Sequence, residues 1–247
     1  MKTRLFTIKK LFLLWLILTF IGPAWLLFNN RVDLKADYRT ANRDSAQLAP
    51  SPADYQDAVV QVYAARAFNW RGLLASHCWI SVKPRNASAY MVYQVVGWNA
   101  YRGLPALTIM QDLPDRNWYN EVPKLVLDVR GDKAEAIIPK IDAAARRYEY
   151  AAPYRVWPGP NSNSFPAYIG REVPELGLAM PADAVGKDFL GSGRFLARAP
   201  SGTGYQFSLF GLFGMLIAKK EGVELNILGL VYGVKFSPFR ILLPGMG

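Results

Sequence analysis

The residues best suited to chemistry begin with the run LASHCWISV, residues 74–82, which contains the only histidine and the only cysteine of the chain. Its β-branched and aromatic residues predict a strand. Because successive side chains of a strand point to opposite faces, His77 shares a face with Trp79, and Cys78 shares the other face with Ile80. We therefore expect Cys78 in the core and His77 on a polar surface such as a cleft, where an imidazole can serve as general base. The alternative is a solitary histidine with a structural role.

A second candidate site lies in GPNSNSF, residues 159–165, where polar residues precede an apolar segment with Pro166 near its start. That order is typical of a helix N-terminus. Unpaired backbone N–H groups and the helix dipole at such a terminus stabilise an anionic nucleophile or an oxyanion, so Ser162 is a candidate nucleophile. The alternative is that the serines and asparagines of this segment only cap the helix.

Other catalytic chemistries are excluded by the residue types or by missing motifs. One histidine and one cysteine cannot supply a zinc site, an iron–sulfur cluster or an internal disulfide scaffold. The chain has no G-x-S-x-G, Walker, H-E-x-x-H or EF-hand motif. The spacing of Glu172 with Glu175, and of Glu221 with Glu224, is more typical of a solvated helix face than of an acid–base pair. We expect no metal and no cofactor.

Short strands and helices must position these candidate residues. Three runs rich in β-branched or aromatic residues predict strands, at residues 59–67, 74–82 and 89–97. Residues 132–148 carry apolar side chains at helical spacing and predict an amphipathic helix. Pro174 limits the helix that follows GPNSNSF to two or three turns. We therefore expect residues 55–247 to form a single α+β domain with an antiparallel sheet and packed helices.

The N-terminal region contains a segment with the length of a membrane span. Residues 11–28 are uncharged and apolar. The basic side chains of residues 1–10 predict a cytoplasmic amino terminus and a main domain that faces the periplasm or its equivalent, with the lipid bilayer as a partner. A cleaved signal peptide is the alternative, although the run is longer than usual and no small-x-small site follows it. Residues 29–54 are polar and have the composition of a linker.

The net positive charge and one further apolar segment indicate which binding partners to expect. The formal net charge is +10, and residues 1–35 carry half of it. The other basic residues form no cluster typical of a nucleic-acid footprint, so we expect no nucleic-acid partner. Residues 205–218 are apolar and uncharged but too short for a span. This stretch predicts a buried strand pair or helix, or a segment that rests on the membrane surface and handles lipid.

Five segments together carry a family resemblance: SHCWISVKP, the VGW of residues 96–98, WPGPNSNSF, the PSGTG of residues 200–204, and EGVELNILGL. They resemble an uncharacterised bacterial family of membrane-anchored proteins, domain of unknown function 3750, over nearly all of residues 59–247. The resemblance implies a single-pass protein of the bacterial inner membrane with a periplasmic domain, and it implies no activity.

A more distant resemblance concerns function. In the permuted branch of the papain-like NlpC-type superfamily, which includes cell-wall peptidases and lecithin retinol acyltransferase, a strand histidine precedes an Asn-Cys motif that opens a helix. His77 resembles the first feature, and Asn161, Ser162 and Asn163 resemble the second, with serine in place of cysteine. The resemblance implies a permuted papain-like fold in which Ser162 is the nucleophile, His77 is the general base, and the two asparagines support them.

Serine in place of cysteine leaves two functions open, because a serine hydroxyl needs a well-aligned base and oxyanion hole. One is a hydrolase or acyltransferase that acts on amide or ester bonds of cell-wall peptide or lipid. The other is an inactive module that binds peptide, glycan or lipid in the same cleft. The resemblance implies that Gln94 or Tyr90 orients His77. Three aromatic residues are expected to line the cleft, Trp79, Tyr154 and Trp157.

Overall fold

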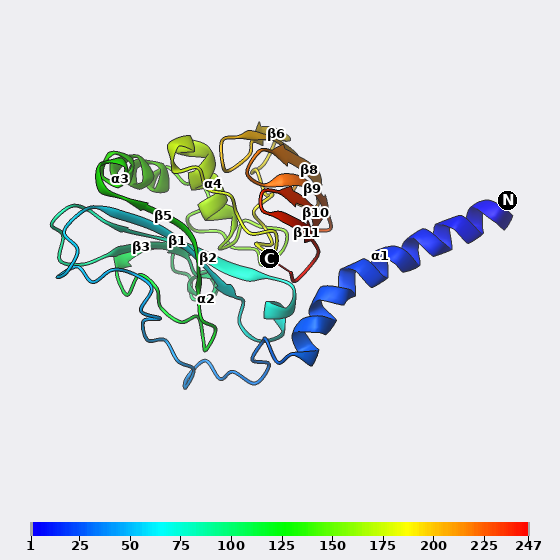
Figure 1. Ribbon diagram of the computed structural model, residues 1–247, viewed down its shortest axis with the longest axis horizontal. Coiled ribbons are helices and arrows are strands. Elements are labelled where there is room, and N and C mark those ends of the chain that lie inside the picture. Colours follow the sequence, from blue (N-terminus) through cyan, green and yellow to red (C-terminus); the bar gives the residue numbers. More distant parts are fainter. Residues whose placement is uncertain (1, 247) are drawn as a thin grey trace.

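The computed structural model describes residues 2–246, with side chains from residue 7 onward. Figure 1 shows a domain with two β-sheets, helices packed beside them, and a long N-terminal helix that projects from one side. Within the described residues every strand pair is antiparallel. The fold is therefore α+β, as the sequence predicts. The expected basic start, residues 1–10, lies partly outside the described residues, as does residue 247 at the end of the expected domain.

The first sheet carries His77 and has the strand order β4-β3-β2-β1-β5. In chain order the strands are β1 Val59–Arg66, β2 Ser76–Lys83, β3 Met91–Val95, β4 Leu107–Gln111 and β5 Lys124–Arg130. The first three coincide with the predicted runs, and their ends differ from the prediction by at most two residues. The sequence analysis did not predict β4 and β5. The register of β1 with β2 places Ala65 opposite His77, near the end of the sheet where β2 begins.

Two helices cover one face of this sheet (Figure 1). They are α3 Gly131–Arg146, where the sequence predicts an amphipathic helix, and α4 Ser164–Glu172, where it predicts a short one. Ala134, Ile137 and Ile141 recur at helical spacing and are buried in the same core as Cys78 and Ile80. The prediction of a core cysteine is confirmed. Three shorter elements complete this half: η1 Asn69–Leu73, α2 Gly97–Tyr101 and η2 Pro174–Leu176.

The opposite face of the first sheet carries His77 and a small aromatic cluster. Tyr63 and Trp79 stack there, with ring centroids 5.6 Å apart. The indole Nε1 of Trp79 donates a hydrogen bond of 2.7 Å to the carbonyl oxygen of Pro114, and the hydroxyl of Ser81 donates one of 2.9 Å to the same oxygen. The loop between β4 and β5 is thereby fixed over this face.

The segment that we expect to be a linker, residues 29–54, is hydrogen-bonded to the domain. The carboxylate of Asp115 accepts a hydrogen bond of 2.7 Å from the Ser45 hydroxyl, and others of 2.5 and 3.0 Å from the backbone N–H groups of Leu48 and Ala49. The backbone N–H of Asn117 donates to the carbonyl oxygen of Asp44 at 2.8 Å. These bonds hold residues 38–50 as a strap across the face that carries His77.

The second sheet is built from the C-terminal part of the chain in the order β11-β10-β9-β8-β7-β6. Its strands are β6 Leu196–Arg198, β7 Gly204–Leu209, β8 Phe213–Ala218, β9 Gly222–Ile227, β10 Leu230–Phe236 and β11 Phe239–Leu242. The apolar stretch 205–218 forms the β7–β8 hairpin, with alternate residues exposed and buried. This confirms the strand pair but not its burial on both faces.

Polar side chains lie on the inner face of this sheet. Gln206, Ser208, Glu224 and Asn226 are all buried there. Glu224 forms an ion pair with the buried ammonium of Lys187, and Glu221 accepts a hydrogen bond of 2.6 Å from the Ser201 hydroxyl. The expectation that the Glu221 and Glu224 pair lies on a solvated helix face is therefore wrong, because both residues belong to a strand region whose inner face is polar. Glu172 and Glu175 are exposed, as expected.

The N-terminal helix α1 Lys2–Phe28 contains the expected span, and its part from Thr7 to Phe28 is long and apolar enough to cross a membrane. One side of its last turns contacts the domain. The Thr19 hydroxyl lies 2.6 Å from the hydroxyl of Tyr232 on β10, and Leu26 is buried. A side chain on Gly22 would overlap the carbonyl oxygen of Pro244, so glycine allows the helix to approach the C-terminal turn closely.

Candidate functional site

A cavity of about 1300 Å³ lies on the face of the first sheet that carries His77. Its wall combines the strap, the start of α2 and the loop between β4 and β5. Two kinds of side chain predominate in it: the aromatic residues Tyr38, Phe68, Trp98, Tyr101, Trp118, Tyr119 and Tyr154, and the basic residues Arg39, Arg43, Arg71 and Arg102. Asp44 is the one acidic residue among the described residues of the wall. The cavity therefore offers flat apolar surfaces and positive charge to a ligand.

The imidazole of His77 is fixed within a stack of aromatic rings. Its ring centroid lies 3.6 Å from that of Trp118, and the two planes differ by only 10°. Trp98 stacks on Trp118 at 5.6 Å and extends the stack toward solvent. Burial lowers the pKa of His77 to about 3, and a hydrogen bond with the side chain of Gln94 acts in the opposite direction. His77 is therefore neutral at neutral pH.

The Nε2 atom of His77 is buried and has no hydrogen-bond partner within residues 2–246. A buried nitrogen without a partner carries a desolvation cost, and such atoms in native proteins commonly meet a ligand, a water or a reacting group. His77 lines the cavity, which is large enough to hold one of these. Of the two residues expected to orient the imidazole, Gln94 is the one whose side chain affects the pKa of His77. The hydroxyl of Tyr90 instead donates to the carbonyl oxygen of Pro50 at 2.9 Å.

Asn161 and Ser164 organise the chain that enters α4. The Asn161 Oδ1 accepts hydrogen bonds from the backbone N–H groups of Asn163, at 2.9 Å, and Ser164, at 3.2 Å. Its Nδ2 donates to the carbonyl oxygens of Val156 and Val185, each at 3.0 Å. The Ser164 hydroxyl donates to the carbonyl oxygen of Gly186 at 2.8 Å. These two side chains hold the loop and the helix terminus, whereas the N-cap residue Asn163 makes no side-chain capping hydrogen bond.

Asn163 connects the start of α4 to the strand of the histidine. Its Nδ2 donates hydrogen bonds of 2.8 Å to the carbonyl oxygen of Ser76, the residue before His77, and to that of Val185. Ser162, between the two asparagines, is 8% exposed. Among the described residues no side-chain hydrogen bond engages Ser162, and none joins it to His77. The helix terminus and the start of β2 are thus bound together while Ser162 is left unengaged.

The structure places the three expected aromatic cleft residues in different surroundings. Tyr154 lines the cavity. Trp79 is buried beneath it, with its ring centroid 5.7 Å from that of His77. Trp157 lies away from the cavity: it is 51% exposed, and its indole Nε1 donates to the carbonyl oxygen of Leu228 at 2.9 Å.

Several residues of the cavity were not among the site residues predicted from the sequence. Trp98 and Trp118 complete the stack on His77, and Arg43 lies over the ring of Tyr119, with its guanidinium carbon 4.3 Å from the ring centroid. They come from α2, a long loop and the strap, so no common spacing in the sequence connects them. Within the described residues, no group of three His, Cys, Asp or Glu side chains is placed to hold a metal ion.

Gly186 offers a test of how the start of α4 is supported. It has a φ of +99°, and a Cβ there would overlap the side-chain amide of Asn161. We expect Gly186→Ala to lower the free energy of unfolding by about 1–3 kcal/mol, because it adds backbone strain and displaces a bonded side chain. Thermal unfolding of the full chain in detergent measures this. Gly193→Ala is the control, since its φ of +80° carries the same strain and no atom lies within 4 Å of the added methyl. Equal losses in both variants would mean that Asn161 adjusts freely.

Comparisons with known proteins give one match. The family model described as "Protein of unknown function (DUF3750)" matches residues 57–189, which include β2 with His77, the cavity residues from Phe68 to Val156 and the start of α4. No curated protein and no solved structure matches the chain. The match covers more than half of the chain and all of the candidate site except the strap, and the chain belongs to this family of proteins of unknown function.

Proposed function

We propose that this protein hydrolyses or transfers acyl groups at amide or ester bonds, with Ser162 as nucleophile and His77 as general base. The observation that carries the proposal is the unpartnered, buried Nε2 of His77, a residue that lines the cavity and follows Ser76, whose carbonyl oxygen accepts a hydrogen bond from Asn163 at the start of α4. A permuted papain-like arrangement would place a nucleophile at this helix terminus and a base on this strand.

The chemistry would follow from the protonation states. The unpartnered Nε2 of the neutral His77 would accept the proton of the Ser162 hydroxyl as that oxygen attacks a carbonyl carbon. Because burial lowers the pKa of His77 to about 3, this step requires the developing oxyanion or the substrate to stabilise the imidazolium in the complex. Gln94 and Trp118 would hold the ring in place, and the positive end of α4 would favour the developing oxyanion. The proton then passes from His77 to the leaving group, and water or a second acceptor releases the acyl group from Ser162. Ser162 would have to move into the His77 cavity in the substrate complex, because the two side chains are not hydrogen-bonded here and Ser162 does not line that cavity.

The substrate class follows from the cavity and from the membrane helix. Four arginines and a stack of indole rings favour a substrate with an anionic group next to a flat or apolar part. Cell-wall peptides and acylated lipids both have such groups. A single span by α1, with the domain in the periplasm of a bacterial inner membrane, would place the cavity where both occur.

Fluorophosphonate labelling of the full chain in detergent tests the proposal. Wild type is expected to label at Ser162, because an activated serine reacts with this probe, and both Ser162→Ala and His77→Ala are expected to lose the label. The control is Ser192→Ala, which removes an exposed hydroxyl and should keep full labelling. Melting temperatures must be compared, since His77 is buried and its variant loses packing as well as a base.

A second candidate function is a binding module that uses the same cavity without catalysis. The observation that favours it is the 3.6 Å stack of His77 on Trp118, which gives the imidazole a structural role. Folded wild-type protein that takes no label would favour this function over the first, with a peptide, a glycan or a lipid as ligand. Labelling that survives in Ser162→Ala would reject Ser162 as the nucleophile.

A further inference from the structure

The outward face of the second sheet is apolar, and none of the described residues forms a layer over it. Residues in register across four strands, Phe207, Met215, Leu225 and Tyr232, form one continuous row on it. The first three are each more than 40% exposed. Ordinary sheets place apolar side chains inward and polar ones toward water, whereas this sheet buries Gln206, Glu224 and Asn226 on its inner face. The inverted pattern requires an apolar environment on the outside.

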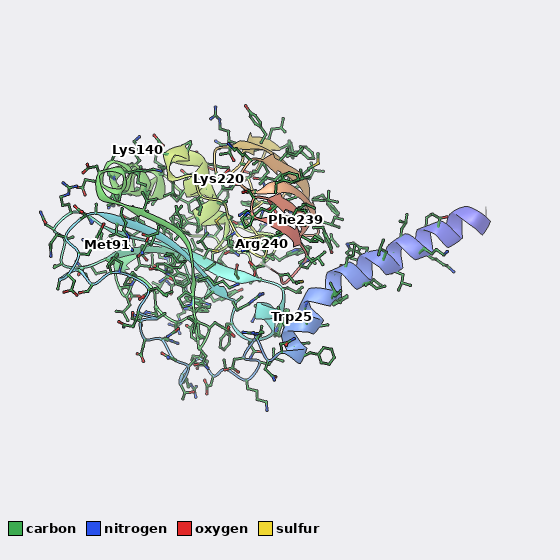
Figure 2. The ribbon with its side chains drawn as sticks, viewed as in Figure 1. Trp25, Met91, Lys140, Lys220, Phe239 and Arg240 are labelled. Carbon is green, nitrogen blue, oxygen red and sulfur yellow. The ribbon has the colours of Figure 1, made fainter. Side chains whose placement is uncertain are left out.

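The helix α1 borders this face directly. Tyr232, the last residue of the row, contacts Thr19 of α1 through its hydroxyl. Figure 1 shows α1 leaving the domain on the side of the second sheet, and Figure 2 shows Phe239 at the edge of that sheet and Trp25 on the nearby helix. The exposed apolar surface of α1 is therefore continuous with the exposed apolar surface of the sheet.

The position of the contact between Thr19 and Tyr232 along α1 indicates how deep the sheet would lie in a membrane. The end of the helix at Phe28 lies nine helical steps after Thr19, which corresponds to about 14 Å at 1.5 Å per residue. Half of a hydrocarbon core is about 15 Å thick. If the part of α1 from Thr7 to Phe28 spans a bilayer, Tyr232 lies at the depth of acyl chains rather than in the water above them.

The charges around the sheet complement an anionic membrane surface. Residues 191–246 contain six Lys or Arg side chains and two acidic ones, Glu221 and Glu224. Both glutamates are buried on the inner side, whereas basic residues such as Lys219 and Arg240 are exposed. The surface of this region is therefore cationic next to its apolar face, a combination that binds the headgroups and the upper acyl chains of lipid.

We propose that the outward face of β7–β11 inserts into the leaflet from which α1 emerges, so that the domain is both anchored by a helix and embedded by a sheet. The bonded strap supports this arrangement, because residues 38–50 are fixed on the domain and cannot act as a free tether that holds it away from the membrane. This inference does not depend on any catalytic activity.

Two cysteine variants of the full chain test the insertion. Met215→Cys lies on the outward face, and Met110→Cys on β4 of the first sheet is the matched control, since both methionines are about half exposed on strands. Each variant is labelled with an environment-sensitive fluorophore and reconstituted in vesicles of phosphatidylethanolamine and phosphatidylglycerol. The unmodified chain, whose one cysteine is buried, gives the background. We expect the label at position 215 to emit at shorter wavelength and to lose most of its emission when the acyl chains are brominated. The label at position 110 should do neither.

Two results would overturn the insertion. Water-like emission at both positions would show that the outward face is solvated. Emission at short wavelength from position 215 that brominated chains do not quench would show that protein covers the face, either a second copy of this chain or another partner. Neither outcome bears on labelling by fluorophosphonate, so failure of this inference and failure of the proposed activity can be told apart.

Discussion

Lys187→Met is expected to lower the free energy of unfolding by about 3–5 kcal/mol. The Lys187 ammonium lies between the carboxylates of Asp188 and Glu224, and all three side chains are almost fully buried. Burial alone would lower the pKa of Lys187, but the two carboxylates raise it, so the ammonium remains charged. Removing it leaves two neighbouring acidic groups without the ammonium that pairs with both, and burial already raises the pKa of Glu224. For a chain of this size the melting temperature should fall by roughly 6–20 °C.

Two further variants isolate the role of burial in this result. Lys140→Met is the matched control, because Lys140 pairs with Glu175 at 2.6 Å but both side chains are about half exposed. It should change the free energy of unfolding by less than about 1 kcal/mol. The double variant Lys187→Met with Glu224→Gln removes one buried cation and one buried anion, and it should lose less than the sum of the single variants. Losses in the free energy of unfolding that add up in the double variant would show that Lys187 and Glu224 do not stabilise each other. Equal losses in Lys187→Met and Lys140→Met would show that burial does not strengthen the ion pair.

The sequence predicts the elements of the first half of the chain because their signals are local. In β2, Cys78 and Ile80 alternate with His77 and Trp79, and in α3 the residues Ala134, Ile137 and Ile141 recur at helical spacing. Both patterns predict directly which side chains are buried in the core. The strands β4 and β5 lack such a pattern because they lie at the edges of the sheet, where most of their residues are partly exposed.

The burial of the second sheet could not be predicted in the same way, because its polar residues are buried and its apolar residues are exposed. Alternation of Tyr205, Phe207 and Leu209 with Gln206 and Ser208 predicts a strand, but it also predicts that the apolar residues are inside. The structure places Gln206 inside, bonded to Asp188, since the partners that satisfy its amide come from the loop after α4. Only tertiary contacts reveal these partners.

The candidate site was predictable in its strand and helix terminus but not in its walls. His77 is marked by strand alternation, and Asn161 is marked by its place before α4. Trp98, Trp118 and Arg43 come from three separate segments that converge on the His77 face of the first sheet. Their convergence depends on Asp115, which binds the strap to the loop between β4 and β5, and no short-range pattern encodes that contact.

The pH dependence of stability should report the burial of His77. Burial lowers its pKa from the ordinary value of 6.5 to about 3, so between these values the unfolded chain binds a proton that the folded chain does not. The free energy of unfolding therefore rises with pH between about 3 and 6.5. The contribution of the neutral His77 is complete above pH 6.5 and is lost as the pH decreases toward 3. At pH 4.5, which is two units below the ordinary pKa of 6.5, the loss in the free energy of unfolding from this group is about 2–3 kcal/mol. Other buried acids titrate as well, since burial also raises the pKa of Glu121, so the test requires a variant for comparison.

His77→Phe supplies that comparison, because phenylalanine can still stack on Trp118 and does not titrate. Between pH 7 and pH 4.5, wild type should lose about 2–3 kcal/mol more than His77→Phe, which corresponds to a melting temperature roughly 4–12 °C lower relative to the variant. The measurement is thermal unfolding of both full chains in one detergent across this range. His77 is the only histidine, so no other imidazole contributes to the difference. Parallel curves would mean that the folded state admits a proton to His77. A steeper wild-type curve would establish a neutral, buried imidazole in the folded chain.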